Sequence, residues 1–180
     1  MVKEKLITKK EAILRIDPNS LDTLLHPTLD EKSLINVIAN GLPASPGAAS
    51  GKVVFTSEEA ERLTAMMQDT ILVRIETSPE DIQGMHAAKG ILTARGGMTS
   101  HAAVVARGMG RPCVSGSSEI DINYEKKTFK TSSIEIKEGE VITIDGSTGR
   151  IISGSVATIK PEISGDFSKI MTWADSFRKL

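Results

Sequence analysis

One histidine of this chain stands in a stretch whose residue types suit phosphate chemistry. Residues 96–107 read GGMTSHAAVVAR, so His101 follows two glycines, a methionine and two hydroxyl residues, and it precedes small apolar residues. Glycine lets a backbone approach a ligand closely, and the first N–H groups of a helix lack intrahelical partners and attract anions. We therefore predict an anion site at a helix start, with Thr99 or Ser100 as the cap.

His101 is the candidate nucleophile of this site. The positive end of a helix dipole disfavours a cationic imidazole, which keeps a ring nitrogen available for attack on a phosphoryl group. Such an attack is covalent catalysis, because it splits one transfer into two steps. Arg95 and Arg107 flank the histidine and could neutralise phosphate charge. The residues alone leave open a second interpretation, in which His101 is an ordinary capping or packing histidine.

Strands and helices alternate around this stretch from Gly41 onward. Runs of β-branched residues predict strands, and Gly, Pro and capping residues mark the turns between them. We predict strands at 52–55, 70–74, 90–94 and 112–116, helices from about residue 57 and over 77–90, and β-structure over 127–154. The strand at 90–94 leads directly into the two glycines, so His101 is expected just beyond the end of a sheet strand.

The first forty residues contain three helix-start signals. A hydroxyl residue three positions before Glu predicts a capping box, and Asp-Pro predicts a cap followed by the first helical residue. The signals are Thr8-x-x-Glu11, Asp17-Pro18 and Thr28-x-x-Glu31, the last of which leads into SLINVIAN at 33–40. We predict short helices after each of them and read residues 1–40 as a helical linker.

Composition excludes several classes of function. Of 180 residues, 25% are charged and only 3% are aromatic, with a net charge of −1. These values argue against broad electrostatic binding to nucleic acid or to an anionic membrane, and against stacking on single strands. No apolar stretch is long enough to span a bilayer, and the only cysteine suits a reducing compartment. We expect a cytoplasmic chain.

The histidine stretch and its surroundings resemble a known enzyme family. Residues 96–116, GGMTSHAAVVARGMGRPCVSG, resemble the phosphohistidine signature of the PEP-utilising enzymes, which interconvert phosphoenolpyruvate and pyruvate. LPASPGAASGKVVF, at 42–55, is similar to the loop and strand that open the same domain in that family. Within the family, residues 74–116 look most like the pyruvate, phosphate dikinases. The PEP synthases and the sugar-phosphotransferase Enzyme I usually have Arg where Met98 stands.

The resemblance implies an α/β fold, namely a compact three-layer β/β/α swivelling phosphohistidine domain flanked by short helical linkers. It assigns residues 41–155 to this domain, 1–40 to a linker from a nucleotide-binding domain, and 156–180 to a linker toward a pyruvate-binding barrel. It makes His101 the phosphoryl carrier, phosphorylated on Nε2. The expected phosphate-binding residues are Gly96, Gly97, Thr99, Ser100 and Arg107.

The implied reaction is the reversible conversion of ATP, pyruvate and phosphate into AMP, phosphoenolpyruvate and diphosphate. The partners expected are an ATP-grasp domain and a barrel domain, which this sequence lacks, so the chain alone should not complete the reaction. We expect no metal and no cofactor in this chain, Mg²⁺ and a homodimer in the full enzyme, and no nucleic-acid or membrane partner. Thr99 matches a threonine on which a regulatory kinase and phosphorylase act, and a second dianion there would repel the phosphoryl group.

Two rival functions remain open from the sequence. One is the carrier domain of a phosphoenolpyruvate synthase, and the other is a non-catalytic docking module that binds anions. Two further residues carry their own expectations: Cys113 is interpreted as a core residue, and Met98 either packs beneath the site or stays exposed for docking. His86 is interpreted as structural, because it has no Asp, Glu or Cys at metal-binding spacing. His26 is also interpreted as structural, because it precedes Pro27 at an expected helix end, where an imidazole can meet free carbonyls.

Overall fold

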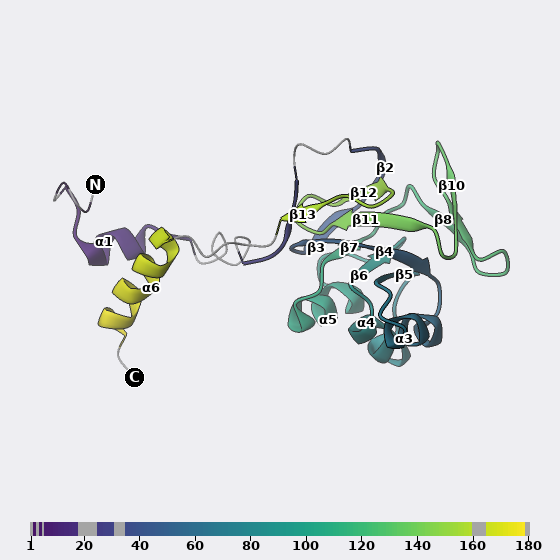
Figure 1. The fold of residues 1–180 in the computed structure, drawn as a ribbon, viewed down its shortest axis with the longest axis horizontal. Coiled ribbons are helices and arrows are strands. Elements are labelled where there is room, and N and C mark those ends of the chain that lie inside the picture. Colours follow the sequence, from purple (N-terminus) through teal and green to yellow (C-terminus); the bar gives the residue numbers. More distant parts are fainter. Residues whose placement is uncertain are drawn as a thin grey trace. The chain divides into compact units, whose positions relative to one another are not determined.

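The computed structural model describes residues 2, 4, 6–17, 25–30, 35–159 and 165–178 (Figure 1). These residues form two compact units. One unit contains the described residues of Met1–His26 and Lys160–Leu180, and the other is Pro27–Ile159. The first unit holds α1 (Lys9–Leu14) and α6 (Gly165–Phe177). The second holds the histidine stretch.

An eight-stranded mixed sheet forms the centre of the second unit, in the order β2-β12-β11-β4-β5-β6-β7-β3. Its strands are β2 (Val37–Asn40), β3 (Leu42–Ser45), β4 (Ala48–Val54), β5 (Thr70–Arg74), β6 (Gly90–Thr93), β7 (Cys113–Ser115), β11 (Val141–Asp145) and β12 (Arg150–Ser153). The four neighbours β4, β5, β6 and β7 run parallel, and all other pairs are antiparallel.

Helices connect the parallel strands, because a parallel pair needs a crossover connection. α3 (Ser57–Ala65) joins β4 to β5, the short 3₁₀ turn η1 (Pro79–Asp81) with α4 (Ile82–Ala87) joins β5 to β6, and α5 (His101–Met109) joins β6 to β7. Figure 1 shows the three helices together on one side of the sheet. The carboxyl ends of β5 and β6 therefore lead into neighbouring loops, and the histidine stretch is one of them.

Two smaller sheets complete the unit. β1 (Thr28–Leu29) pairs with β13 (Thr158–Ile159). The other sheet is antiparallel, in the order β10-β9-β8, and we call it the arm; its strands are β8 (Asp121–Asn123), β9 (Thr128–Lys130) and β10 (Glu135–Lys137). The core of the arm joins the core of the large sheet through Phe129, which is fully buried.

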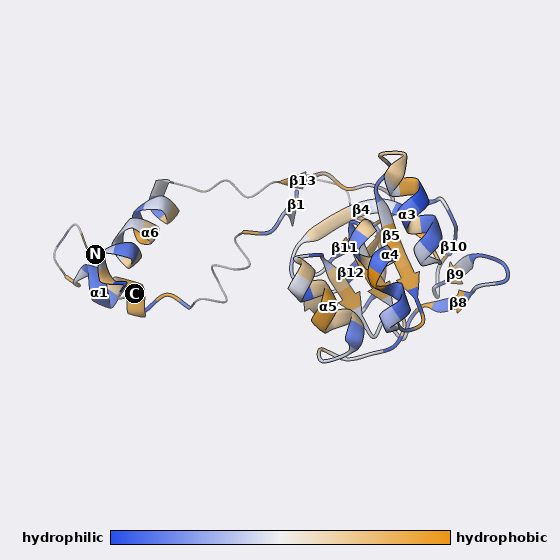
Figure 2. Ribbon diagram, turned by 90° about the horizontal axis from the view of Figure 1, so that it is seen from below, coloured by the Kyte–Doolittle hydropathy of each residue, from blue (hydrophilic) through white to orange (hydrophobic). Residues whose placement is uncertain are grey.

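The two faces of the large sheet bury separate cores. In β5, Ile71 and Val73 pack into a core shared with the arm, whereas Leu72 between them packs into a core shared with the helices. This alternation is the period of a strand that is covered on both faces. Figure 2 shows hydrophobic residues on β5 and hydrophilic ones on the neighbouring α3. The predicted α/β fold with β/β/α layers is confirmed.

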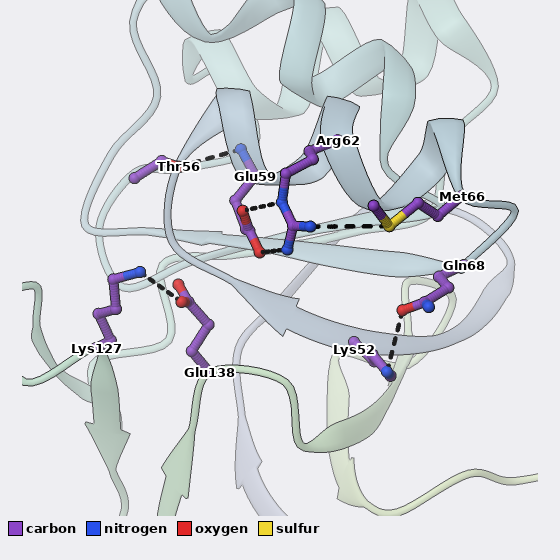
Figure 3. Close-up of polar contacts among 8 residues, drawn as sticks. All are labelled: Lys52, Thr56, Glu59, Arg62, Met66, Gln68, Lys127 and Glu138. Carbon is purple, nitrogen blue, oxygen red and sulfur yellow. Dashed lines mark hydrogen bonds and ion pairs between the residues drawn. The ribbon is translucent and has the colours of Figure 1, made fainter.

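Figure 3 shows one ion pair on α3 and another between loops of the arm. Arg62 donates to both carboxylate oxygens of Glu59, at 2.8 and 2.6 Å, and this hydrogen bonding lowers the pKa of Glu59. Lys127 lies 2.6 Å from Glu138, which raises the pKa of the lysine. Glu138 also raises the pKa of Arg62, more weakly than Glu59 does.

The helix predictions for the first forty residues have mixed outcomes. Thr8 caps α1 through a complete capping box with Glu11, as predicted. The helix expected after Asp17-Pro18 falls on residues outside those described. The helix expected over 33–40 is wrong for residues 37–40, which form β2. Pairing with β12 and burial of Ile38 on the sheet override the local helix signal.

Other local predictions hold with small shifts. The four strands predicted at 52–55, 70–74, 90–94 and 112–116 correspond to β4, β5, β6 and β7. The helix predicted over 77–90 is shorter, since it consists of η1 and α4 and ends at Ala87. In the described part of the chain, no helix has both the length and the apolar character needed to cross a membrane.

Candidate active site

His101 is the first residue of α5, and the chain reaches it from the end of β6. Ser100 is the N-cap residue, and its Oγ accepts a hydrogen bond from the Ala103 N–H at 3.4 Å. Of the two predicted caps, Thr99 and Ser100, the structure has Ser100. The N–H groups of His101 and Ala102 open the helix and have no intrahelical carbonyl to bond. The half-buried imidazole thus lies beside free donors at the positive end of a helix.

The two glycines before the histidine differ in what their backbones require. Gly96 has a φ of +111°, and a Cβ added there would lie 2.9 Å from the Cβ of Ser100. A Cβ added at Gly97 would meet nothing within 4 Å. The fold itself therefore requires glycine at 96, whereas a Cβ at Gly97 would point into open space. Open space beside free N–H donors is what an incoming phosphoryl group needs.

The glycine loop rests on the end of β7, which the sequence did not reveal. Gly116 has a φ of +61°, and a Cβ there would lie 2.3 Å from the carbonyl oxygen of Gly96. Ser115 Oγ donates to the carbonyl of Gly97 at 3.3 Å. In the sequence, Gly116 is only a glycine after a short predicted strand. Nothing in the sequence indicates that it contacts the glycine loop.

Arg107 contacts backbone carbonyls on two sides. Its Nε donates to the carbonyl of Ala44 at 2.6 Å, and its NH2 group donates to the carbonyl of Met98. The guanidinium therefore joins the glycine loop to β3, a contact that sequence spacing could not show. Arg95 is exposed and pairs loosely with Glu76, at 4.0 Å. Phosphate binding by Arg107 stays a prediction.

A threonine from the neighbouring loop contacts the imidazole. Thr77 Oγ1 lies 3.0 Å from Nδ1 of His101, and both side chains are half-buried. Thr77 follows β5 and the histidine stretch follows β6, so the contact joins the carboxyl ends of adjacent parallel strands. Ligand sites in open α/β sheets characteristically lie at these ends. Sequence reasoning missed Thr77, although the residue directly follows Glu76 beyond a predicted strand, because the sequence does not say which strands are neighbours.

Several side chains around the histidine are exposed. Met98 is 43% exposed and Val104, on α5, is 55% exposed. Thr99 is also exposed. Of the two expectations for Met98, the exposed position fits the structure better than packing beneath the site. Exposed apolar side chains near a half-buried histidine are suited to transient contact with a partner surface.

The other cysteine and histidine side chains that the structure describes lie apart from this site. Among the described residues, no three His, Cys, Asp or Glu side chains lie close enough to hold a metal ion. Burial raises the pKa of the Cys113 thiol to about 12, and Cys113 packs in the core beneath the helices. The interpretation of Cys113 as a core residue is confirmed. His86 lies exposed on α4.

Comparison with known proteins agrees with this geometry. Residues 66–149 match the model of the PEP-utilising enzyme mobile domain. The whole chain is 57% identical over 180 residues to a pyruvate, phosphate dikinase of Rhizobium meliloti, covering 20% of that protein. It is 57% identical over 182 residues to that of Clostridium symbiosum, covering 21% of it. An Arabidopsis thaliana relative, "Pyruvate, phosphate dikinase 1, chloroplastic", is 53% identical over 182 residues, with 19% covered.

The family-model match at residues 66–149 includes the glycine loop, α5 and the histidine. The similarity to the three relatives covers all of this chain. The chain spans about a fifth of the length of these relatives. From its histidine stretch, its β/β/α layers and these similarities, the chain belongs to the PEP-utilising enzyme family, whose mobile domain it contains.

Proposed function

We propose that this chain is the phosphoryl-carrier domain of a pyruvate, phosphate dikinase and that His101 carries the phosphoryl group on Nε2. The observation that supports this proposal most is the position of His101 as the first residue of α5. It follows a glycine loop that leaves open space at Gly97. The overall reaction would convert ATP, pyruvate and phosphate into AMP, phosphoenolpyruvate and diphosphate, reversibly.

The transfer chemistry follows from the site. The Nε2 lone pair of His101 forms a bond to phosphorus, and the bond from phosphorus to the donor's bridging oxygen breaks, with the electron pair leaving on that oxygen. In the second step an oxygen of the acceptor attacks phosphorus, and the N–P electron pair returns to Nε2. The N–H groups at the start of α5 and the helix dipole would stabilise the phosphoryl charge throughout.

The role of each loop residue is part of the proposal. Gly97 would admit the phosphoryl group, and the free N–H groups that follow Ser100 would bind it. Arg107 would act through its hold on the Met98 carbonyl, which keeps the loop in place, and through its positive charge. Thr99 is exposed, as a residue modified by a regulatory kinase and phosphorylase must be. A phosphate on Thr99 would repel the incoming phosphoryl group.

The partners proposed are a nucleotide-binding ATP-grasp domain and a pyruvate-binding barrel. Residues 41–155 would be the carrier domain, with 1–40 and 156–180 as linkers to these partners. In the fold, the compact unit is somewhat larger, since it runs from Pro27 to Ile159. Exposed Met98 and Val104 would contact each partner in turn. The full enzyme would be a homodimer in the cytoplasm, a compartment supported by the free, buried cysteine.

Mg²⁺ would assist the full reaction by neutralising phosphate charge. In this proposal the ion would be held by the partner domains, and no step assigned to this chain passes through it.

The first experiment tests whether His101 carries phosphate. The chain is mixed with phosphoenolpyruvate, Mg²⁺ and a separately produced barrel domain, and its mass is measured. A gain of one phosphoryl group that is acid-labile and base-stable is expected in the wild type and in the His86→Ala control. The gain should be absent in His101→Ala. No gain in a folded wild-type chain, with a barrel domain that phosphorylates another carrier, would favour the anion-binding docking module instead.

A second comparison separates the two catalytic candidates. In the intact enzyme, a dikinase requires inorganic phosphate as the second phosphoryl acceptor, whereas a phosphoenolpyruvate synthase does not. We expect the synthesis of phosphoenolpyruvate from ATP and pyruvate to depend on added phosphate. Synthesis at full rate in phosphate-free buffer would show that the carrier domain belongs to a synthase.

A further inference from the structure

We propose that Thr77 is a positioning residue for the carrier histidine: its hydroxyl accepts a hydrogen bond from the Nδ1–H of His101 and so leaves Nε2 as the nucleophile. This inference rests on the carrier function proposed above and assigns it a residue outside the histidine stretch. Thr77 does not touch the phosphoryl group, since it acts on the opposite nitrogen of the ring.

The geometry selects one ring nitrogen. The Oγ1 atom of Thr77 lies 3.0 Å from Nδ1 of His101, and this is the only hydrogen bond of the imidazole within the described part of the chain. A neutral imidazole has one N–H and one nitrogen lone pair. When Nδ1 donates to Thr77, the lone pair is on Nε2. The reverse arrangement, with Thr77 donating to Nδ1, would place the proton on Nε2 and block attack.

A hydroxyl partner suits both states of a carrier. During attack the Nδ1–H proton stays on the ring, so the phosphorylated ring becomes cationic and its bond to Thr77 strengthens. If the ring then loses this proton, the hydroxyl can rotate and donate to the Nδ1 lone pair. A carboxylate could only accept, and it would add negative charge beside the phosphoryl group. Thr77 therefore holds the ring in each state without opposing the phosphate charge.

The residues that follow Thr77 are anchored by a buried carboxylate. The N–H of Ser78 donates to Asp81 Oδ2 at 2.9 Å. Asp81 is only 5% exposed, and its Oδ1 accepts from Ser57 Oγ at 3.0 Å. Arg74 Nε lies 3.4 Å from the same oxygen. A carboxylate held by several partners has little freedom to move, so the chain beside Thr77 is fixed on this side.

The residues that precede Thr77 are anchored by the arm and by the histidine loop. The N–H of Ile75 donates to the hydroxyl of Tyr124 at 2.8 Å, and the Arg74 guanidinium lies 5.3 Å from the centre of the Tyr124 ring. The carbonyl of Ile75 accepts from the N–H of Arg95 at 2.8 Å. A backbone hydrogen bond thus joins the loop of Thr77 directly to the loop of the histidine. This bond helps to hold the two side chains at a fixed distance.

The test measures the tautomer of His101 directly. The whole chain, labelled with ¹⁵N-histidine, is compared by NMR as wild type, Thr77→Val and Thr77→Ser. We expect the Nδ1–H tautomer to predominate in the wild type, to lose population to the Nε2–H tautomer in Thr77→Val, and to return in Thr77→Ser. Phosphorylation by phosphoenolpyruvate and the barrel domain should slow by about 10–100-fold in Thr77→Val, as for loss of the partner that orients a ligating histidine.

The outcomes separate the two proposals. Thr77→Val with the wild-type tautomer and the wild-type rate would overturn the positioning role. A purely structural role would lower stability in Thr77→Val without moving the tautomer, and thermal unfolding of the same samples measures that. If Thr77→Val fails to fold, Thr77→Ala removes the same hydroxyl and takes its place. A folded wild type that takes no phosphate would overturn the carrier function itself, whereas the tautomer measurement needs no phosphorylation.

Discussion

Gly116 and Gly96 approach so closely that no side chain fits between them: a Cβ on Gly116 would lie 2.3 Å from the carbonyl oxygen of Gly96. The two residues come from different loops, one after β7 and one after β6. Gly116 also has a left-handed backbone, with a φ of +61°. The conformation of the glycine loop that precedes His101 therefore also depends on a glycine outside the histidine stretch.

We expect Gly116→Ala to destabilise the fold more than Gly110→Ala does. Both residues are left-handed, with φ of +61° and +63°, but a Cβ on Gly110 would meet nothing within 4 Å. Gly110→Ala should cost only the backbone strain, about 1–2 kcal/mol. Gly116→Ala should cost about 1–3 kcal/mol more, because the Gly96 carbonyl must move. Urea denaturation measures both, and equal losses would contradict the close contact.

Gly97→Ala should separate function from stability. Because a Cβ there meets nothing within 4 Å, the free energy of unfolding should change by less than about 1 kcal/mol. Phosphorylation of His101 should slow at least about tenfold, since the methyl group occupies the space proposed for the phosphoryl group.

Gly96→Ala is the matched control for this change. Gly96 has a φ of +111°, and a Cβ added there would lie 2.9 Å from the Cβ of Ser100. We therefore expect Gly96→Ala to lower the free energy of unfolding by at least about 1 kcal/mol. A Gly97→Ala chain that is phosphorylated at the wild-type rate would show that the phosphoryl group approaches from elsewhere.

Asp81→Asn should lower stability by about 1–3 kcal/mol, because Asp81 is buried and binds both Ser57 and Ser78. The amide cannot accept at both of its ends, and the charge of Arg74 loses its partner. Glu80→Gln, at an exposed neighbouring position, should change stability by less than about 0.5 kcal/mol. Thermal unfolding measures both. Similar small effects in the two variants would mean that Asp81 does not anchor the loop of Thr77.

Cys113 should react with thiol reagents only when the chain unfolds. Burial raises the pKa of its thiol from 9.0 to about 12, so the native chain has almost no thiolate at neutral pH. Because the native state holds this proton more tightly than the unfolded state, its contribution to stability should fall as pH rises from about 9 toward 12. Modification kinetics across a urea titration provide the check. Rapid labelling in native buffer at pH 8 would contradict burial of the thiol.

Local signals in the sequence were sufficient for several helix starts and for the position of the candidate nucleophile. Thr8 caps α1 as predicted, and Ser100, one of the two predicted candidates, caps α5, because a capping bond joins residues three positions apart. The strands β4 to β7 were found from short apolar runs between turn residues. His101 was predicted as a residue of the first helical turn after two glycines, and it is the first residue of α5.

Contacts between distant parts of the chain were decided only by the tertiary structure. Residues 37–40 carry a helix-like pattern, yet they form β2 because β12 offers a paired edge and a buried face. The contact of Thr77 with His101 joins two loops that meet only because β5 and β6 lie side by side. Hydrogen bonds within one helical turn can be read from neighbouring residues, whereas strand pairing and loop contacts depend on which segments the whole fold brings together.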